Sequence, residues 1–218
     1  MSFAHGANTE YVLSNRKVFL DSLGVNIEHL VCAKQIHDNS VMVIHDGHRG
    51  RGALSHETAI ADTDAFVTNV SNVALSIFTA DCLSIFFFDP VHKAIGIAHA
   101  GWKGTRGEVA LKTIRVMQSE YKSDASDIVV GFGPAIRSCC YEVGDEFAEY
   151  FRKELVRKQG RYFLDIVGAN KRQLLSIGVK QESIFDCGIC TSCKHVDFFS
   201  YRKEKENAGR MISIIMLR

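Results

Sequence analysis

Six short runs of β-branched and aromatic residues crowd the first half of this chain, and their spacing constrains the fold more than any other feature. Several runs are separated by only a few residues, so neighbouring runs are close enough to pair as hairpins. The runs predict strands at residues 30–33, 40–44, 65–70, 73–78, 83–88 and 94–98. Because hairpin connections join antiparallel strands, we expect a mixed sheet and not a purely parallel one.

The remainder of the chain adds helices to this sheet. Helical spacing of apolar residues predicts helices at 10–23, 109–121, 145–158 and 166–177, and further strands are expected at 128–132, 183–185 and 211–217. With 218 residues, 46% hydrophobic side chains, two prolines and no linker or repeat, the chain fits one domain spanning 1–218. We therefore predict an α/β (α+β) fold with a mixed β-sheet core and helices packed on it.

Charge and cysteine content limit the partners and the compartment. The formal net charge of +1 leaves no basic stripe for nucleic acid. There is no signal-like amino terminus and no apolar run of about eighteen residues, which predicts no membrane partner and a cytoplasmic location. Seven cysteines, an odd number that includes the adjacent pair Cys139 and Cys140, favour reduced thiols over a secreted disulfide scaffold.

A thiol and an imidazole follow two of the predicted strands. Cys82 ends the run Thr79-Ala80-Asp81-Cys82, and His99 comes seventeen positions later. Such a pair makes either a nucleophile with its base or two ligands of a metal. His37 also follows a predicted strand, and two imidazoles with one thiolate suit zinc while leaving a fourth position open for water or substrate.

Spacing alone leaves the third ligand undecided. His45, His48 and His56 compete with His37 for that place, and any of these histidines can also be an ordinary packed or exposed residue. The metal is equally open, because thiolate and imidazole donors accept copper as well as zinc. Zinc is the expected ion, with copper as the alternative.

A glycine-rich turn follows the strand that leads to His99. Residues 101–107 contain three glycines together with Lys103 and Arg106, and they open a predicted helix. Close backbone approach, free N–H groups and positive charge together make a candidate phosphate or carboxylate cradle. The glycine spacing matches neither the dinucleotide fingerprint nor the Walker loop, and a tight turn without a ligand is the plainer interpretation.

Three cysteines cluster near the carboxyl end of the chain. Cys187, Cys190 and Cys193 form two overlapping C-x-x-C units, with His195 close behind. They suit a structural zinc knot or an iron–sulfur site only if Cys139 or Cys140 joins them, since the ligand set is otherwise incomplete. Reduced surface or packed thiols are the favoured interpretation of this motif.

The motifs taken together resemble the YfiH/YlmD family, a family described both as multicopper polyphenol oxidoreductase or laccase-type domains and as purine nucleoside phosphorylases. The resemblance covers nearly the whole chain. It rests on Lys34-Gln35-Ile36-His37, Ala61-Asp62-Thr63-Asp64-Ala65, Thr79-Ala80-Asp81-Cys82, His99-Ala100-Gly101-Trp102-Lys103-Gly104, Gly133-Pro134-Ala135-Ile136, Tyr141-Glu142-Val143-Gly144, Cys190-Thr191, Phe198-Phe199-Ser200-Tyr201-Arg202 and Gly209-Arg210.

The resemblance implies a sandwich-like α/β fold related to cysteine hydrolases of the cytotoxic necrotizing factor type. It implies one metal site, usually zinc, whose ligands are His37, Cys82 and His99. The implied activities are phosphorolysis of adenosine, inosine, guanosine and methylthioadenosine to base and ribose 1-phosphate, and hydrolytic deamination of adenosine. The implied partners are therefore purine nucleosides and phosphate.

Further roles are hypotheses placed on this framework. His37, Cys82 and His99 are counted as catalytic as well as metal-binding, and Asp81 is the fourth candidate catalytic residue. Asp62, Asp64 or Glu142 are alternative proton carriers. Substrate contacts are assigned to Lys103 and Arg106 for phosphate, with Arg202 and Glu142 beside them. Phe199 or Tyr201 offers a stacking face, although a strand whose aromatic side chains pack in the core is preferred for the phenylalanines.

Other functions stay open at this point. Cys82 with His99 as its base can act on an amide without metal, as an amidase editing peptidoglycan precursors would. Polyphenol oxidation and a non-enzymatic metal-binding role are the remaining candidates.

The family has a longer amino-terminal segment with a Thr-Arg-x-Gly-Gly-x-Ser type motif, and about forty residues of it are expected to be missing before the stretch 1–6. Such a loss would leave an edge strand open and remove part of the pocket.

Overall fold

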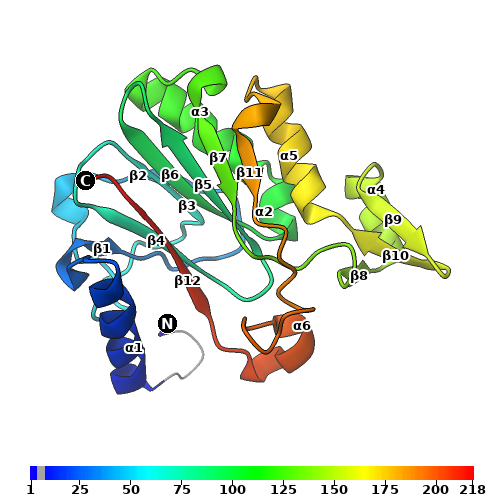
Figure 1. Ribbon diagram of the computed structural model, residues 1–218, viewed down its shortest axis with the longest axis horizontal. Helices are drawn as coiled ribbons and strands as arrows, with labels where there is room; N and C mark the ends of the chain where they lie inside the picture. Colours follow the sequence, from blue (N-terminus) through cyan, green and yellow to red (C-terminus); the bar gives the residue numbers. More distant parts are fainter. Residues whose placement is uncertain (4–7) are drawn as a thin grey trace.

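The computed structural model describes residues 1–3 and 8–218. Residues 4–7, which include part of the amino-terminal stretch considered above, lie outside the described residues. The described chain is built on a mixed six-stranded sheet in the order β11-β7-β5-β6-β3-β2 (Figure 1). Its strands are β2 (Val41–Val43), β3 (Ala65–Thr68), β5 (Leu83–Asp89), β6 (Ala94–Ala100), β7 (Val129–Phe132) and β11 (Ile184–Asp186).

Both strand directions occur in this sheet, which confirms the predicted mixed topology. β5 pairs antiparallel with β6 and β7, and β3 pairs antiparallel with β6. β2 and β11 lie at the two edges and pair in parallel with β3 and β7. The short connection from β5 to β6 is the hairpin that the sequence spacing required.

A second sheet covers one face of the six-stranded sheet. It has three strands in the order β1-β4-β12, namely β1 (Leu30–Val31), β4 (Ala74–Thr79) and β12 (Met211–Met216). Side chains alternate along β6, so that Ile95 and Ile97 pack with Leu75 and Ile77 of β4 in one buried cluster. This layer gives the fold its sandwich character.

Helices cover the opposite face. Ala98 and Ala100 of β6 point toward α3 (Val109–Tyr121), where Ile114 and Met117 pack against them. A Cβ atom on Gly96 would lie 3.2 Å from Thr113, so small residues on this face of β6 let the helix come close to the sheet. Helices α2 (Trp102–Arg106) and α5 (Ile166–Ser176) lie beside α3, whereas α1 (Thr9–Ser22) packs through Leu20 against the three-stranded sheet. The remaining helices are the short α4 (Ala148–Phe151) and α6 (Tyr201–Glu204).

Short 3-10 turns link several of these elements, at η1 (Ile27–His29), η2 (Asp46–His48), η3 (Ala125–Asp127), η4 (Asp145–Phe147), η5 (Gln181–Ser183) and η6 (Lys205–Asn207). Helices α1, α3 and α5 confirm three predicted helices within one or two residues at each end. In the described part of the chain, no helix has the length and apolar character needed to cross a membrane.

The predicted helix at 145–158 is wrong over its second half. Only η4 and the four-residue α4 are helical, and β9 (Leu155–Lys158) follows them. β9 pairs with β10 (Arg161–Leu164), and β10 pairs with β8 (Glu142–Val143), which makes a small antiparallel sheet at the side of the molecule (Figure 1). Gln159 and Gly160 both have positive φ, 49° and 78°, as a tight hairpin turn requires.

The aromatic motif before Arg202 is not a strand. Residues 191–198 form turns, and Tyr201 begins α6. Phe199 is 44% exposed and lies against Gly209, where a Cβ would sit 2.6 Å from its ring. The preferred interpretation of these phenylalanines as core strand residues is therefore wrong.

Candidate metal centre

Three potential ligands meet where strands of both sheets end. Cys82 directly precedes β5, and His99 lies near the end of β6, opposite Ser84 in the register. His37 comes from the loop after β1. The ligand atoms of these three residues all lie within 4.8 Å of one another. We call this group the metal centre, and its geometry selects His37 over the three competing histidines.

The competing histidines have other surroundings. His45 and His48 stack with ring centroids 5.8 Å apart in η2, where the His45 backbone N–H donates to Nδ1 of His48 at 3.0 Å. His56 lines the neighbouring pocket but is not a member of the three-residue group. The sequence could not separate these residues because each follows a short strand or turn.

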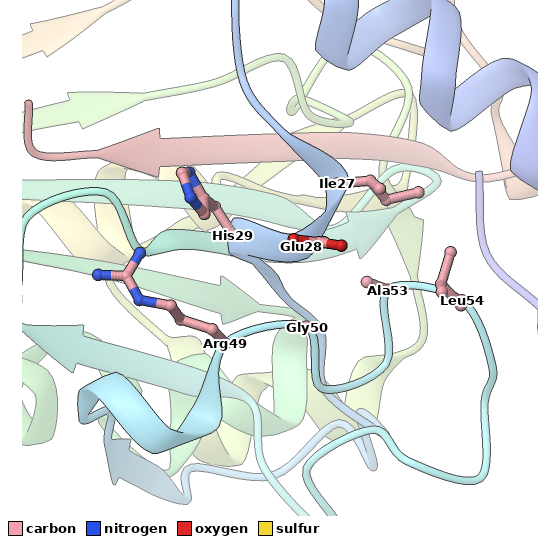
Figure 2. Close-up of a pocket in the computed structure, with 7 residues that line it drawn as sticks. All are labelled: Ile27, Glu28, His29, Arg49, Gly50, Ala53 and Leu54. Atoms are coloured by element: carbon pink, nitrogen blue, oxygen red, sulfur yellow. The ribbon is translucent and has the colours of Figure 1, made fainter.

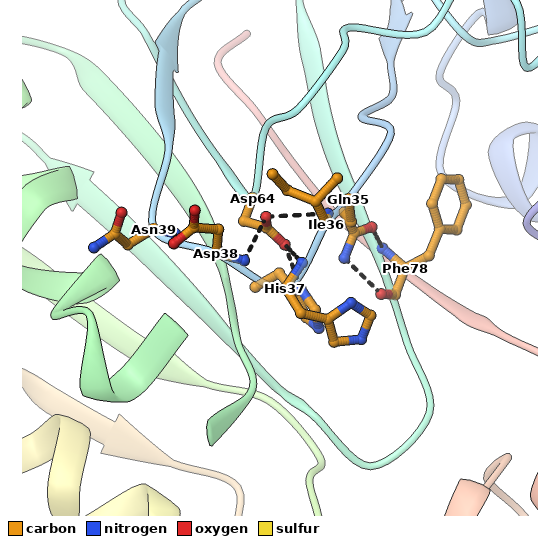
Figure 3. A network of polar contacts seen from close by, with 8 residues as sticks. Gln35, Ile36, His37, Asp38, Asn39, Asp64 and Phe78 are labelled. Atoms are coloured by element: carbon orange, nitrogen blue, oxygen red, sulfur yellow. Dashed lines mark hydrogen bonds and ion pairs between the residues drawn. The ribbon is translucent and has the colours of Figure 1, made fainter. Parts of the chain in front are cut away.

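Asp64 organises the metal centre from behind. Its carboxylate accepts from the backbone N–H groups of Ile36, His37 and Asp38 at 3.2, 3.0 and 2.9 Å (Figure 3). It also accepts from Nδ1 of His99 at 2.7 Å. Asp64 is fully buried, and His99 is 2% exposed. A carboxylate bound to one ring nitrogen directs the other nitrogen of His99 toward a ligand, as in many zinc sites.

A second contact holds the loop that carries His37. The Gln35 side chain donates to the Phe78 carbonyl at 2.9 Å and accepts from the Phe78 N–H at 2.7 Å (Figure 3). These two bonds tie the loop to β4 in the way that a neighbouring strand would. His37 itself has a left-handed backbone, with φ at 62°, which non-glycine residues adopt where surrounding contacts hold them.

The Cys82 thiol and the His99 imidazole shift each other's pKa. Burial raises the pKa of Cys82, but His99 and His37 outweigh burial and lower it to about 6. Burial lowers the pKa of His99, whereas Cys82 and Asp64 together raise it to about 9. At neutral pH the metal-free centre therefore holds a thiolate beside an imidazolium, and the thiolate is the form that binds metal or attacks a substrate.

Asp81, the predicted proton carrier, lies next to Cys82 with its carboxylate held by three hydrogen bonds. It is 8% exposed, and its carboxylate accepts from the Thr191 hydroxyl at 2.6 Å, the Ser200 hydroxyl at 3.1 Å and the Arg202 backbone N–H at 2.6 Å. Its backbone is left-handed, with φ at 85°. Asp81 thus joins the chain next to Cys82 to the segment 191–202.

A cavity of about 860 Å³ opens over the metal centre. Aromatic residues on its wall include Trp102, Tyr141 and Phe147, and the Trp102 and Phe147 rings lie 5.2 Å apart. Its basic residues are Lys34, Arg202, Lys205 and Arg210. The cavity is therefore large enough for a nucleoside and has both apolar and cationic walls.

The predicted substrate residues divide into two groups. Arg202 and Glu142 line the cavity; the guanidinium of Arg202 donates to the Glu142 carbonyl at 2.9 Å and lies 5.5 Å from the centre of the Tyr141 ring. The Glu142 carboxylate pairs with Arg161 at 3.1 Å. Lys103 and Arg106 are absent from the described residues that line the cavity, and Arg106 lies 3.6 Å over the Tyr150 ring instead.

The glycines of the turn 101–107 lie close to other parts of the protein. A Cβ on Gly101 would lie 3.0 Å from the Cys82 sulfur, and one on Gly104 would lie 2.9 Å from the Asp38 carbonyl. These close approaches let α2 lie near the metal centre, and the phosphate role expected of this turn stays a prediction. Sequence analysis placed Lys34 and Arg210 in motifs of the family resemblance but gave them no role, and it missed Lys205, which stands in an ordinary polar stretch.

A second, smaller cavity of about 370 Å³ lies between η1 and the loop at 49–54 (Figure 2). It is lined by Ile27, Glu28, His29, Arg49, Gly50, Ala53 and Leu54. None of these residues belongs to the metal centre. The large cavity is therefore the candidate substrate site.

Comparison with known proteins agrees with this architecture. The chain is 35% identical over 213 residues to purine nucleoside phosphorylase YlmD of Geobacillus stearothermophilus, an alignment that covers 94% of this chain and 78% of the relative. It is 33% identical to adenosine deaminase RL5 of an unknown prokaryotic organism, over 91% of this chain and 79% of the relative. The crystal structure of Bacillus licheniformis hypothetical protein YfiH superposes with a TM-score of 0.96 at 34% identity, covering 100% and 85% of the two chains.

The family assignment follows from the whole chain and not from one motif. Residues 1–218 match the family described as multi-copper polyphenol oxidoreductase laccase. The YlmD and RL5 proteins are similar to this chain in sequence, and the YfiH structure is similar in both sequence and fold. This chain therefore belongs to the multi-copper polyphenol oxidoreductase laccase family, which includes the YfiH and YlmD proteins.

Proposed function

We propose that the protein is a zinc-dependent purine nucleoside enzyme that cleaves adenosine, inosine, guanosine or methylthioadenosine with phosphate and deaminates adenosine. The observation that carries the proposal is the convergence of His37, Cys82 and His99 on a cavity with aromatic and basic walls. The names of relatives, purine nucleoside phosphorylase and adenosine deaminase, support a purine nucleoside enzyme.

The residues of the metal centre suit a zinc ion. His37, Cys82 and His99 would hold it, and three protein ligands leave one position for water or substrate. Asp64 fixes the His99 ring, and the absence of a side chain on Gly101 leaves room beside the Cys82 sulfur. When bound, zinc supplies Lewis acidity and lowers the pKa of a bound water toward neutrality.

The aromatic wall is the proposed place for the purine base. Tyr141 offers a ring face, and the guanidinium of Arg202 lies 5.5 Å from the centre of that ring. Burial raises the pKa of the Tyr141 hydroxyl, so this group remains a hydrogen-bond donor at neutral pH. A donor toward the purine ring favours departure of the base during phosphorolysis.

The basic wall is the proposed place for phosphate. Arg202, Lys205 and Arg210 come from one short segment that borders the cavity. An arginine guanidinium has five N–H donors; the Glu142 carbonyl takes one of those of Arg202, so others can bind phosphate. Asp81, whose oxygens already accept from Thr191, Ser200 and the backbone of Arg202, acts as a positioning residue for this segment.

Kinetic measurements on variants test whether phosphate binds at the basic wall of the cavity or at the turn 101–107. Arg202→Ala is expected to raise the KM for phosphate about tenfold or more, because a charge-assisted hydrogen bond contributes about 1.5–3 kcal/mol. The matched control is Lys203→Ala, an exposed neighbour that does not line the cavity. A raised phosphate KM in Lys103→Ala with no change in Arg202→Ala would place phosphate at the turn 101–107 instead.

The activity itself is tested on zinc-loaded protein with adenosine, with and without phosphate, by separating the products chromatographically. The proposal predicts adenine only when phosphate is present and inosine in either case. Conversion of inosine, guanosine and methylthioadenosine with phosphate then ranks the substrates. Absence of any product from all four nucleosides would contradict the proposal.

A metal-independent amidase is the second candidate, because the pair Cys82 and His99 with Asp64 also has the order of a nucleophile, a base and an orienting acid. Chelation separates the two functions. A thiolate nucleophile keeps its reactivity, or gains it, when zinc is removed, whereas a zinc enzyme loses turnover. Cleavage of a peptidoglycan-precursor amide by chelated protein would favour the amidase.

A further inference from the structure

Four of the seven cysteines gather on the side of the molecule where two loops meet. Their sulfur atoms all lie within 4.8 Å of one another, and we call the group the cysteine cluster: Cys139, Cys140, Cys190 and Cys193. The first two come from the turn between β7 and β8, and the last two follow β11. None of the four belongs to the metal centre or lines the large cavity.

The spacing of the sulfur atoms fits one tetrahedral metal ion. Zinc–sulfur bonds of about 2.3 Å in a tetrahedron place the sulfur atoms about 3.8 Å apart. The Cys193 sulfur lies 3.3 Å from that of Cys140 and 3.5 Å from that of Cys139, and no pair exceeds 4.8 Å. An iron–sulfur cluster would need wider spacing, because several metal and sulfide atoms lie between its cysteines.

The backbone holds the two loops in place without help from the thiols. Ala135 and Cys190 form a parallel bridge, in which the Thr191 N–H donates to the Ala135 carbonyl at 3.1 Å. The Cys140 N–H donates to the Arg137 carbonyl at 2.8 Å, and Arg137 forms an ion pair with Asp186. The loop backbones are thus fixed before a metal binds, which lowers the entropic cost of assembling four ligands.

Backbone donors point at the sulfur of Cys190. The backbone N–H groups of Cys193 and Arg137 donate hydrogen bonds to it. N–H groups directed at a sulfur are typical partners of metal-bound cysteines. Cys139 and Cys193 are exposed, which gives an ion a path into the cluster.

We propose that the cysteine cluster binds one zinc ion in a closed, structural site, separate from the metal centre. Four thiolates fill the coordination of the ion and leave no position for substrate, so the site stabilises structure and performs no chemistry. The ion would join residues that are about fifty positions apart in the sequence.

The position of the cluster explains what such an ion would stabilise. The loop after β7 continues to Ile136, whose N–H donates to the Asp81 carbonyl at 2.8 Å. The segment after Cys190 reaches the Asp81 carboxylate through Thr191 and Ser200. Both loops that carry the cysteines therefore contact the residue next to Cys82, and the ion would hold two walls of the large cavity together.

Metal content of four purified proteins tests the site directly. Wild-type protein is expected to hold two zinc ions per chain, and His99→Ala is expected to keep only the ion in the cysteine cluster. Cys193→Ser is expected to lose one ion, whereas Cys187→Ser, an exposed cysteine of the same loop outside the cluster, keeps both. Equal zinc content in wild-type and Cys193→Ser protein would overturn the proposal.

Differential alkylation of the unmutated protein gives a test that does not depend on folding of a variant. With zinc present, Cys139 and Cys193 should resist alkylation despite their exposure, and Cys187 should react. After chelation all three should react, as peptide mass mapping would show. Reaction of Cys139 and Cys193 in zinc-loaded protein would overturn the proposal. A blocked pair that stays unreactive after chelation and is two hydrogens lighter would identify a disulfide instead.

Discussion

The metal centre and the proposed zinc site in the cysteine cluster differ in almost every property, although both gather side chains from distant parts of the chain. The metal centre mixes two imidazoles with one thiolate at the ends of strands, beside a large cavity and against a buried carboxylate. The cysteine cluster has four sulfur donors on two surface loops. An incomplete mixed donor set beside a cavity suits chemistry, and a complete set of thiolates suits stability.

The largest effect is expected from Cys82→Ala, which removes a ligand of the metal centre. Turnover of adenosine should fall by more than the roughly 100-fold that loss of an outer partner costs. Metal analysis should show that the ion of the cysteine cluster remains, because the two sites share no residue. Loss of both ions together would show that the two regions are not independent.

Asp64→Asn should weaken the metal centre without removing a ligand. The carboxylate that accepts from His99 and three backbone N–H groups would become an amide, and zinc affinity should fall roughly 10- to 100-fold. Competition with a chelator measures this affinity. Asp62→Asn is the matched control, because Asp62 is exposed and asparagine tolerates its positive φ of 46°. Equal affinities in the two variants would refute the role given to Asp64.

Gly101→Ala tests whether the glycine of the 101–107 turn makes room for the metal centre. Its φ and ψ of −70° and 176° suit alanine, so the added Cβ, 3.0 Å from the Cys82 sulfur, is the only disturbance. We expect zinc affinity to fall roughly tenfold, at the lower end of the range for an outer partner. Gly47→Ala, with no atom within 4 Å of the added Cβ, is the control for the same chelator competition. Unchanged zinc affinity would show that this turn does not constrain the metal centre.

The smallest effect is expected from Arg106→Ala. Arg106 lies over the Tyr150 ring, and an exposed contact of this kind contributes about 0.5–1 kcal/mol to the free energy of unfolding. Denaturant unfolding measures that loss, and the KM for phosphate measured on the same protein should not change. A raised KM with unchanged stability would return phosphate to this turn.

The sequence predicted the sheet and the metal centre for the same physical reason. Runs of β-branched and aromatic residues indicate strands, and a side chain just after a strand lies where that strand ends. Cys82, His99 and His37 each follow a predicted strand, so their meeting could be expected, although the structure extends the strand before His99 to include it. The family resemblance then selected His37 from four histidines, and the structure places the same residue close to Cys82 and His99.

Failures of the sequence analysis occur where contacts are distant or signals conflict. Residues 145–158 begin with apolar spacing typical of a helix, but the turn at Gln159 and Gly160 and pairing with β10 make the last four a strand. The cysteine cluster joins an adjacent pair, Cys139 and Cys140, to two cysteines about fifty positions away. The sequence offered Cys139 or Cys140 as a partner for the later cysteines, but only the fold shows that both join and that Cys187 does not.

Zinc titration of metal-free protein, followed by adenosine turnover in the presence of phosphate, tests the central claim most directly. The account predicts that chelated wild-type protein is inactive, that activity returns as the metal centre fills, and that Cys82→Ala stays inactive at every zinc concentration. Full activity in chelated protein, or in Cys82→Ala, would contradict the assignment of purine nucleoside chemistry to this metal centre.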